Sequence, residues 1–567
     1  MPGSRVRNNV LEVGPVVNDS PERVEVLEGQ DARAILRDQR FLREWAALCR
    51  VCPWATLFQG PKFINAWYDV YVREYTPLLL CGWRGDSLCG LITLAQRVSD
   101  GTPVVAGTYH AEYQVWLCTA EDLPWFLTRA IALFQKRCPN RELSFRYVPE
   151  ELPVDCLRAA GFFITSTVQK RPLMRIDPEE IRRSLSKKSN KSRLNRLKRV
   201  GPVVMERITD VGRFEKVIDD IIWQYDLRQG AVNRSTPFLE DPGKRRFHLA
   251  LMAHPGMLHV TVMRVGEQLV SAHVDFMDGV SAYLGIPTHS PYFFQHSPGK
   301  LHMLLLGQQL ADDGVSCLDL TPGGDPWKER FANDHTNALE LTIHASRTAR
   351  FIDTLPDRLR SGAKRVIGKT GLDPAAVKSV LTHVPIIGSR FADVQPDRLH
   401  PSGTGQLYRV TGAAEAGSND AVAINNPRDL LRRMPNEDLA AKHRLLSGAL
   451  ARLEAGHTLY TVVDEKHLLG LGWLAPDLEA VGLGERAGTG VLNRRVAHGI
   501  AARGPKEMSV RETILRAMLS DAGDGATPVV LVLDADDPWL SRGSFGFELL
   551  TEVDSGSPSA DAGPGGG

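Results

Sequence analysis

Residues 297–331 combine an anion site with a candidate proton acceptor. Ser297, Pro298 and Gly299 stand directly before leucines at helical spacing, so they form the start of a helix. Proline suits the first helical turn because its fixed φ matches the helix and its missing N–H is not needed there. The free N–H groups and positive dipole end of such a start bind anions. We expect Gly299 and Lys300 to contact a phosphate, while Ser297 caps the helix, with or without a phosphate contact of its own.

A short alternating strand follows this helix and ends at a carboxylate. Asp319 lies at the end of the strand 315–320, and the ends of strands are where open α/β sheets commonly place their ligands. Asp275 lies within the alternating strand SAHVDF, on the same face as His273. A charged Asp inside such a strand is energetically costly unless it is paired or hydrated. Tyr283 stands on the next strand. Asp319, Asp275 and Tyr283 are therefore the candidate catalytic residues; the alternative for either Asp is a structural pair with a nearby Lys or Arg.

A strongly basic helix is expected over 187–201. It carries seven cations and only a thin apolar stripe, made by Leu194 and Leu197. Such a cluster suits an anionic substrate, and Lys191 and Arg196 are its candidate substrate-binding residues; the alternative is a solvated linker helix. Nucleic acid is the weaker interpretation, because no second basic surface and no aromatic stacking motif accompanies the helix.

Composition limits the class of protein. The 567 residues carry a net charge of +1, so there is no global attraction to nucleic acid or membrane. No run is long and apolar enough to span a bilayer, and the N-terminus has no apolar signal core, so we expect a cytoplasmic protein. Cys49 and Cys52 have metal-site spacing but no second pair and no nearby His, so no metal site is expected and the thiols are taken as inert.

The order of helices and strands predicts repeated modules. Helix, antiparallel strands, helix and strand follow one another twice, and weaker signals of the same kind appear a third time near the C-terminus. The resulting division is a disordered start (1–24), a first module (25–180), a basic linker helix (181–204), a second module (205–350), a linker (351–404), a third module (405–553) and a disordered tail (554–567).

The region from about residue 25 to residue 345 resembles the CelD-type proteins of bacterial exopolysaccharide gene clusters. These are acetyltransferase-like proteins of the GNAT superfamily, related in fold to the FemAB peptidyltransferases. The resemblance rests on the S-P-G helix start, the strand ending in Asp319, the turn with Trp327 and Lys328 before Phe331, and the basic helix. It implies an α+β fold of tandem GNAT-type (acyl-CoA N-acyltransferase) modules with mixed, mostly antiparallel sheets. It also implies substrate contacts by Tyr113, at the position of a family tyrosine, and by Trp327 and Lys328.

The function that the resemblance implies is acyl transfer from acyl-CoA, with acetyl-CoA as the usual donor. The acceptor would be an amine or hydroxyl of a sugar, nucleotide-sugar or amino-acid-derived precursor, and the resemblance implies a role in polysaccharide or envelope assembly. The usual acetyl-CoA loop of the family, [RQ]xxGx[GA], is absent, and FFQHSPGKLH fills its place in the second module. Two alternatives stay open: FemAB-like aminoacyl transfer from charged tRNA, using the basic helix, and a scaffold whose GNAT modules have lost their chemistry.

Overall fold

The computed structural model describes residues 22–346, 405–410, 421–432, 437–477, 480, 495–503, 507–521, 529–534 and 547–553. The segments 1–21 and 554–567, expected to be disordered, and the linker 351–404 lie outside the described residues, whereas 22–24 already belong to a strand. Packing divides the chain into two compact units, Met1–Leu173 with Leu320–Ile386, and Met174–Asp319 with Ile387–Gly567. Each unit is described by itself.

The first unit is built on an antiparallel sheet. Its strands pair in the order β1-β2-β3-β4, with β5 also on β3, and the hairpin expected at Gly85-Asp86 joins β2 to β3. A second group of strands has β13 antiparallel to both β6 and β7. The elements are β1 (Glu22–Glu28), α1 (Gly29–Ile35), α2 (Gln39–Val51), α3 (Pro61–Val70), β2 (Tyr75–Arg84), β3 (Ser87–Arg97), β4 (Pro103–Val105), β5 (Leu117–Cys118), α4 (Leu123–Arg137), β6 (Leu143–Pro149), α5 (Asp155–Ala159), β7 (Phe163–Arg175) and β13 (Asp334–His344).

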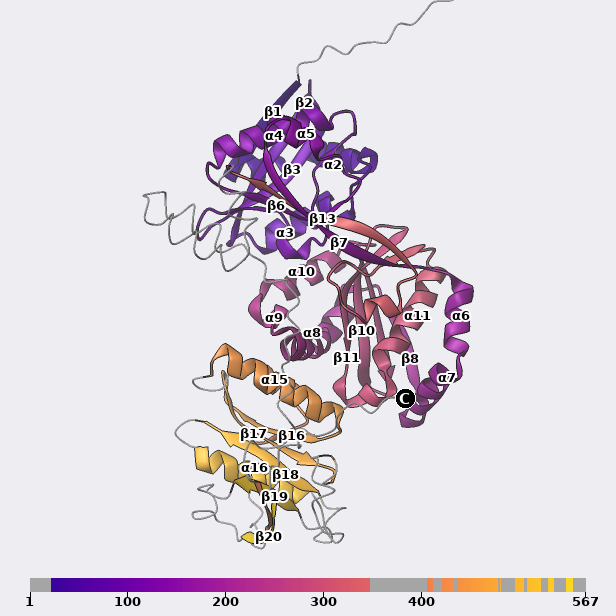
Figure 1. Cartoon of the computed structure of the whole chain (residues 1–567), viewed down its shortest axis with the longest axis vertical. Helices are drawn as coiled ribbons and strands as arrows, with labels where there is room; N and C mark the ends of the chain where they lie inside the picture. Colours follow the sequence, from indigo (N-terminus) through magenta and orange to yellow (C-terminus); the bar gives the residue numbers. More distant parts are fainter. Residues whose placement is uncertain are drawn as a thin grey trace, which may run out of the picture. The chain divides into compact units, whose positions relative to one another are not determined.

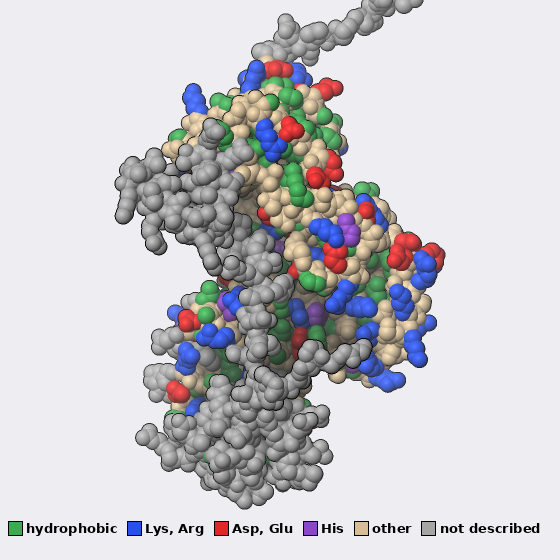
Figure 2. Space-filling model, viewed as in Figure 1, with side chains coloured by type: hydrophobic (Ala, Val, Ile, Leu, Met, Phe, Trp, Pro, Cys, Tyr) green, Lys and Arg blue, Asp and Glu red, His purple; other side chains and the backbone are tan. Residues whose placement is uncertain are grey.

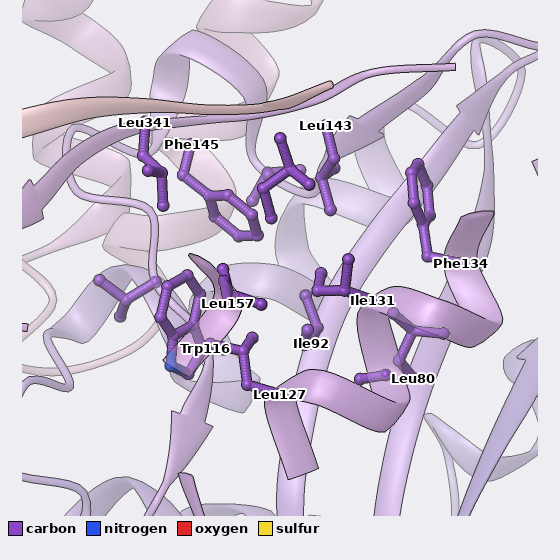
Figure 3. Packing of buried hydrophobic residues seen from close by; sticks show 14 of the residues in the cluster. Leu80, Ile92, Trp116, Leu127, Ile131, Phe134, Leu143, Phe145, Leu157 and Leu341 are labelled. Carbon is purple, nitrogen blue, oxygen red and sulfur yellow. The ribbon is translucent and has the colours of Figure 1, made fainter. Parts of the chain in front are cut away.

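Helix α4 provides the core of the first unit. Its apolar residues recur at helical spacing and face the sheet, so the helix buries one continuous stripe. Figure 3 shows Leu127 and Ile131 of α4 beside Leu80 and Ile92 of the sheet, with Trp116 completing the cluster. Burial of such side chains contributes about 1.5–3 kcal/mol each, which makes α4 the main support of this sheet.

The second unit contains the S-P-G helix. Its strands pair in the order β12-β11-β10-β9-β8, antiparallel except for the parallel pair of β11 with β12. Helix α8 packs on one face of this sheet and α11 on the other (Figure 1). The elements are α6 (Pro178–Ser186), α7 (Lys188–Val200), β8 (Val203–Ile208), α8 (Val211–Asn233), α9 (Pro237–Glu240), α10 (Gly243–Met252), β9 (Leu258–Val265), β10 (Gln268–Met277), β11 (Ser281–His289), η3 (Pro291–His296), α11 (Pro298–Asp312) and β12 (Cys317–Asp319).

The C-terminal part of the second unit has a sheet of its own. Seven strands pair in the order β15-β16-β17-β18-β19-β14-β20. The elements are β14 (Gly405–Val410), β15 (Ala423–Ile424), α15 (Leu439–Glu454), β16 (Thr458–Val463), β17 (Leu468–Ala475), β18 (Val496–Ala502), α16 (Glu507–Asp521), β19 (Val530–Asp534) and β20 (Phe547–Val553). The predicted fold class, α+β with mixed and mostly antiparallel sheets, is confirmed. The boundaries of the modules stay a prediction.

Helix α15 was not anticipated from the sequence, and it packs along α8. His443 Nδ1 lies 3.2 Å from the Gly230 carbonyl oxygen, and Arg228 pairs with Glu454 at 2.8 Å. A Cβ at Gly230 would lie 2.4 Å from a methyl carbon of Leu446, so glycine is what allows the two helices to approach.

The close approach of α4 to the sheet gives the first prediction. A Cβ at Gly90 would lie 2.4 Å from the ring of Phe126, so Gly90→Ala should lower the free energy of unfolding by about 1–3 kcal/mol through overpacking. Urea denaturation measures this. Because Phe126→Leu frees the same space, the double variant should recover part of the loss; purely additive losses would contradict the proposed clash.

Candidate functional site

Strands β11 and β12 run together only briefly. Their register pairs Ser281 with Cys317 and Tyr283 with Asp319, where β12 ends. Strand β11 continues to His289, and within the described residues no strand pairs with 284–289 on that side. The second unit therefore presents an open strand edge beside the end of β12.

A β-bulge lies where this open edge begins. Val274 pairs with Ile286 and Phe276 with Tyr283, so Asp275 faces two residues of β11, Leu284 and Gly285. A Cβ at Gly285 would lie 2.3 Å from the Val274 carbonyl oxygen, so only glycine fits. The Gly285 N–H donates to Asp275 Oδ1 at 3.2 Å. Bulges re-aim backbone groups near active sites, and here a buried carboxylate holds the bulge.

The start of α11 lies against the far end of β11. A Cβ at Gly299 would lie 3.0 Å from His289 Nδ1, so this glycine permits the close approach of helix and strand. Ser297 adopts φ 51° and ψ 53° and makes no side-chain capping bond, so the predicted cap is wrong. Lys300 is exposed in the first turn, whereas His302, also considered for phosphate, is buried and bonded to Thr261 at 2.9 Å.

Two of the three candidate catalytic residues share one face of the sheet. Asp319 and Tyr283 are register partners, both are buried, and the Tyr283 hydroxyl donates to Asp278 Oδ2 at 2.6 Å. Tyr283 also pairs with Phe276, and side chains alternate along a strand. Asp275 therefore points to the opposite face, under α11, and is separated from Asp319 by the sheet.

Three expected substrate contacts belong to the first unit. Tyr113 is buried, with the Arg171 guanidinium 4.7 Å from its ring centre. Trp327 is half-buried and its ring lies 6.4 Å from that of Phe331. Lys328, expected to meet Asp319 or a phosphate, is buried, and its ammonium donates to carbonyl oxygens of the Gly-rich turn.

The cage around Lys328 uses most of its hydrogen-bonding capacity. Nζ lies 3.1 Å from both the Thr321 and Pro322 carbonyl oxygens and 3.2 Å from Thr321 Oγ1. Asp325 adds a carboxylate at 3.3 Å. An ammonium has three protons, so this lysine closes its own turn.

Helix α7 carries the basic cluster. Lys191 and Arg196 are exposed, and Figure 2 shows Lys and Arg side chains gathered over the region of α6 and α7. No cation of α7 has an ion-pair partner among the described residues. Four of these cations line a hollow of about 520 Å³. The residues that line it are Ser186, Lys188, Lys191, Ser192, Asn195, Arg196 and Arg199.

The inner side of α7 joins it to the start of α11. Leu197 is buried in a cluster with Phe293 and Leu301, and Asn190 Nδ2 donates to the Ser184 carbonyl oxygen at 2.8 Å. The charged helix α7 thus packs beside the start of α11.

The sequence interpretation noted His273 and considered His302 for phosphate, but it did not predict that His259 and His302 lie around His273. His259 and His302 are buried with it, and the signal was the placing of His259 and Thr261 at alternate positions of β9. Burial lowers the pKa of His302 well below its usual value, and neighbouring His273 and His259 act in the same direction. Burial also lowers the pKa of His259 and lowers that of His289 to about 3.

These histidines predict loss of stability in acid. Each stays neutral in the fold while the unfolded chain binds a proton below pH 6.5, so the contribution of these histidines to stability is complete above pH 6.5 and declines as pH falls. The decline is up to about 1.4 kcal/mol per histidine per pH unit. Urea denaturation at pH 7.0 and 5.5 measures it, and His302→Gln should reduce the difference. An unchanged difference in His302→Gln would show that His302 is protonated in the fold.

Ser297 adopts a left-handed conformation and does not cap the helix. Its replacement by glycine is therefore expected to stabilise the fold, whereas replacing a capping serine would destabilise it. Ser297→Gly should raise the free energy of unfolding by up to about 1 kcal/mol, because glycine adopts this conformation without strain. Ser297→Ala should change it by less than the ~1 kcal/mol of a lost cap. Thermal denaturation compares the two; a larger loss in both variants would reveal a stabilising hydroxyl contact.

Comparison with known proteins places this site in a recognised type of domain. Residues 185–329 match the acetyltransferase (GNAT) domain family, a type of domain that generally uses acyl-CoA as co-substrate. No curated protein matches the chain. None of the helices in the described ranges is long and apolar enough to cross a bilayer.

Several solved structures resemble the chain at low identity. FemX is 10% identical over 55% of this chain and 98% of its own, with a TM-score of 0.40. A tandem GNAT protein from the clavulanic acid biosynthesis pathway is 13% identical over 57% and 99%, with a TM-score of 0.35. The C-terminal domain of a putative lysylphosphatidylglycerol synthetase from Agrobacterium fabrum is 13% identical over 51% and 93%, with a TM-score of 0.34. The segment 185–329 is thus similar to GNAT acetyltransferase domains.

Proposed function

We propose that the second unit is an acyltransferase that takes its acyl group from acyl-CoA, with acetyl-CoA as the first donor to test. The observation that carries the proposal is the end of pairing between β11 and β12 at Tyr283 and Asp319. It leaves the backbone of 284–289 open at one edge, beside the start of a 15-residue helix.

The physical argument is a match between this edge and the two ends of an acyl-CoA. A pantetheine chain carries amides, which can hydrogen-bond to an open strand edge as an added strand does. The pyrophosphate is a dianion, which backbone N–H groups at the start of α11 can bind. A strand N–H at the bulge can polarise the thioester carbonyl, as fixed donors do where negative charge develops. In this proposal Ser297, Gly299 and Lys300 line the phosphate end.

The acceptor must lose a proton as its amine or hydroxyl attacks the thioester carbon. Asp319, beside Tyr283 at the end of the paired region, is the proposed base, acting directly or through a water. Lys191 and Arg196 of α7 are proposed to attract an anionic acceptor such as a nucleotide-sugar. Tyr113, Trp327 and Lys328 stay proposed substrate contacts, although Lys328 is caged by its own turn.

The finer assignment is proposed on the sequence resemblance alone. It makes the chain a CelD-type tandem GNAT protein acting on a sugar or amino-acid-derived precursor in exopolysaccharide or envelope biosynthesis. The unpaired cations of α7 favour a second candidate, aminoacyl transfer from charged tRNA, because a row of cations suits a phosphodiester backbone.

The donor site is tested by ligand binding and by one matched pair of variants. Acetyl-CoA, longer acyl-CoAs and bulk tRNA should be screened for a rise in melting temperature, and we expect the acyl-CoAs to stabilise the chain. Asp319→Asn keeps size and removes charge, so turnover should fall 100-fold or more, the usual contribution of a general base. Asp312→Asn, at an exposed position of α11, is the control.

Three outcomes would contradict parts of this proposal. Stabilisation by tRNA alone would favour aminoacyl transfer. Binding of acyl-CoA without turnover of any acceptor would favour a scaffold. If Asp319→Asn lowers stability while the folded fraction keeps its specific activity, Asp319 is structural and the proposed base lies elsewhere.

The role of α7 is tested by removing two charges. Lys191→Gln with Arg196→Gln should raise KM for an anionic acceptor about tenfold at low salt and leave kcat unchanged, because exposed cations steer substrates without entering the chemistry. Arg43→Gln with Lys62→Gln, two exposed cations of the first unit, controls for net charge. An equal effect of both pairs would assign the change to overall charge.

A further inference from the structure

A cluster of polar side chains lies inside the second unit, on the sheet face that α11 covers. Register pairs His259 with Asp275 and Thr261 with His273 across β9 and β10. His302 reaches this layer from α11, with its ring centre 4.8 Å from that of His273. All five side chains are 0–2% exposed. An interior of this kind is normally apolar, and polar groups persist there when they are fully hydrogen-bonded.

Four atoms of this cluster have no hydrogen-bond partner. They are His259 Nδ1, His273 Nδ1, His302 Nδ1 and Asp275 Oδ2. His273 Nδ1 lies 3.7 Å from Asp275 Oδ2, which is an ion-pair contact but too long for a direct hydrogen bond. Within the described residues, no group of three or more His, Cys, Asp or Glu side chains is arranged to hold a metal ion.

The charged groups around Asp275 determine whether the buried cluster carries a net charge. The titratable or charged groups facing it are His259 from β9, with Asp313 and Arg207 beyond it, His273 from its own strand, His302 from α11 and His289 from β11. Arg207 already pairs with Asp313, which also accepts from His259 Nε2 at 3.1 Å. No lysine or arginine pairs with Asp275 in the part of the chain that the structure describes. An isolated buried carboxylate is prohibitively costly, so a proton must reside within the cluster.

We propose that Asp275 and His273 form a buried acid–base pair that holds one proton and positions the bulge of β11. Asp275 links the two parts of this role, because Oδ2 faces His273 while Oδ1 accepts the Gly285 N–H. Its importance for acyl transfer rests on the proposed function. The pair itself does not, since it follows from burial and geometry alone. Asp275 is then a positioning residue that acts through the backbone of Gly285.

The proton held by the pair predicts a pH effect on unfolding. The folded chain binds one proton that the unfolded chain releases at pH 7–8, where free Asp and most free His are deprotonated. Raising the pH from 7 to 8 should therefore increase the unfolding constant about tenfold more in the wild-type chain than in Asp275→Asn. Asp275→Val, an apolar replacement suited to a buried strand, should behave like Asp275→Asn. Asp278→Asn, in the same hairpin but exposed, should keep the wild-type slope.

A second measurement tests the positioning role without any ligand. The Gly285 amide should exchange with solvent faster in Asp275→Val than in Asp275→Asn, because Asn retains an acceptor oxygen and Val does not. Equal pH slopes in wild type and both Asp275 variants would overturn the shared proton, and equal exchange rates would overturn the positioning of the bulge. Binding of acetyl-CoA to the wild-type chain is measured separately, so failure of the proposed function is distinguished from failure of this proposal.

Discussion

The parting of β11 from β12 is the constraint on which the site depends. A sheet normally satisfies its backbone groups by pairing neighbouring strands, and here one strand is left open for part of its length. The opening begins at the bulge around Gly285, where the backbone approaches Val274 too closely for any side chain. Because Asp275 receives the Gly285 N–H, the bulge is fixed by a bond in addition to steric fit. The open edge is therefore fixed by the steric fit at Gly285 and by its bond to Asp275.

A second group of close approaches fixes α11 relative to this edge. Gly299 allows the start of the helix to rest on His289, and Leu301 joins Leu197 of α7 in one apolar cluster. The packing of α7 must offset repulsion among its own cations, which lack carboxylate partners in the described ranges and several of which lie three residues apart. The helix that bears this cost packs beside the start of α11, and under the proposed function its charge attracts a phosphorylated substrate.

The sequence was sufficient for the parts of the structure that depend on pattern. Alternation and helical spacing gave the strands of the second unit, the S-P-G helix and α7, since these signals are local. It could not show that Asp275 and Asp319 lie on opposite faces, because one extra residue at Gly285 changes the register between β10 and β11. It placed a cap at Ser297, where the chain instead turns left-handed. It also left Lys328 available for substrate, because its cage forms only when the turn folds back on itself.

The C-terminal sheet bears on the same site through α8. This helix packs against β11, the strand of Tyr283, and Gln224 donates to the Leu269 carbonyl oxygen of β10 at 3.0 Å. On its other side α8 receives α15, with Leu446 against Gly230 and Leu227 in the shared apolar cluster. Helix α8 thus packs against the sheet on one side and against α15 on the other. A change at Gly230 would displace α8 from α15 and from the sheet together, so the C-terminal part supports the wall of the proposed acceptor site whether or not it performs chemistry of its own.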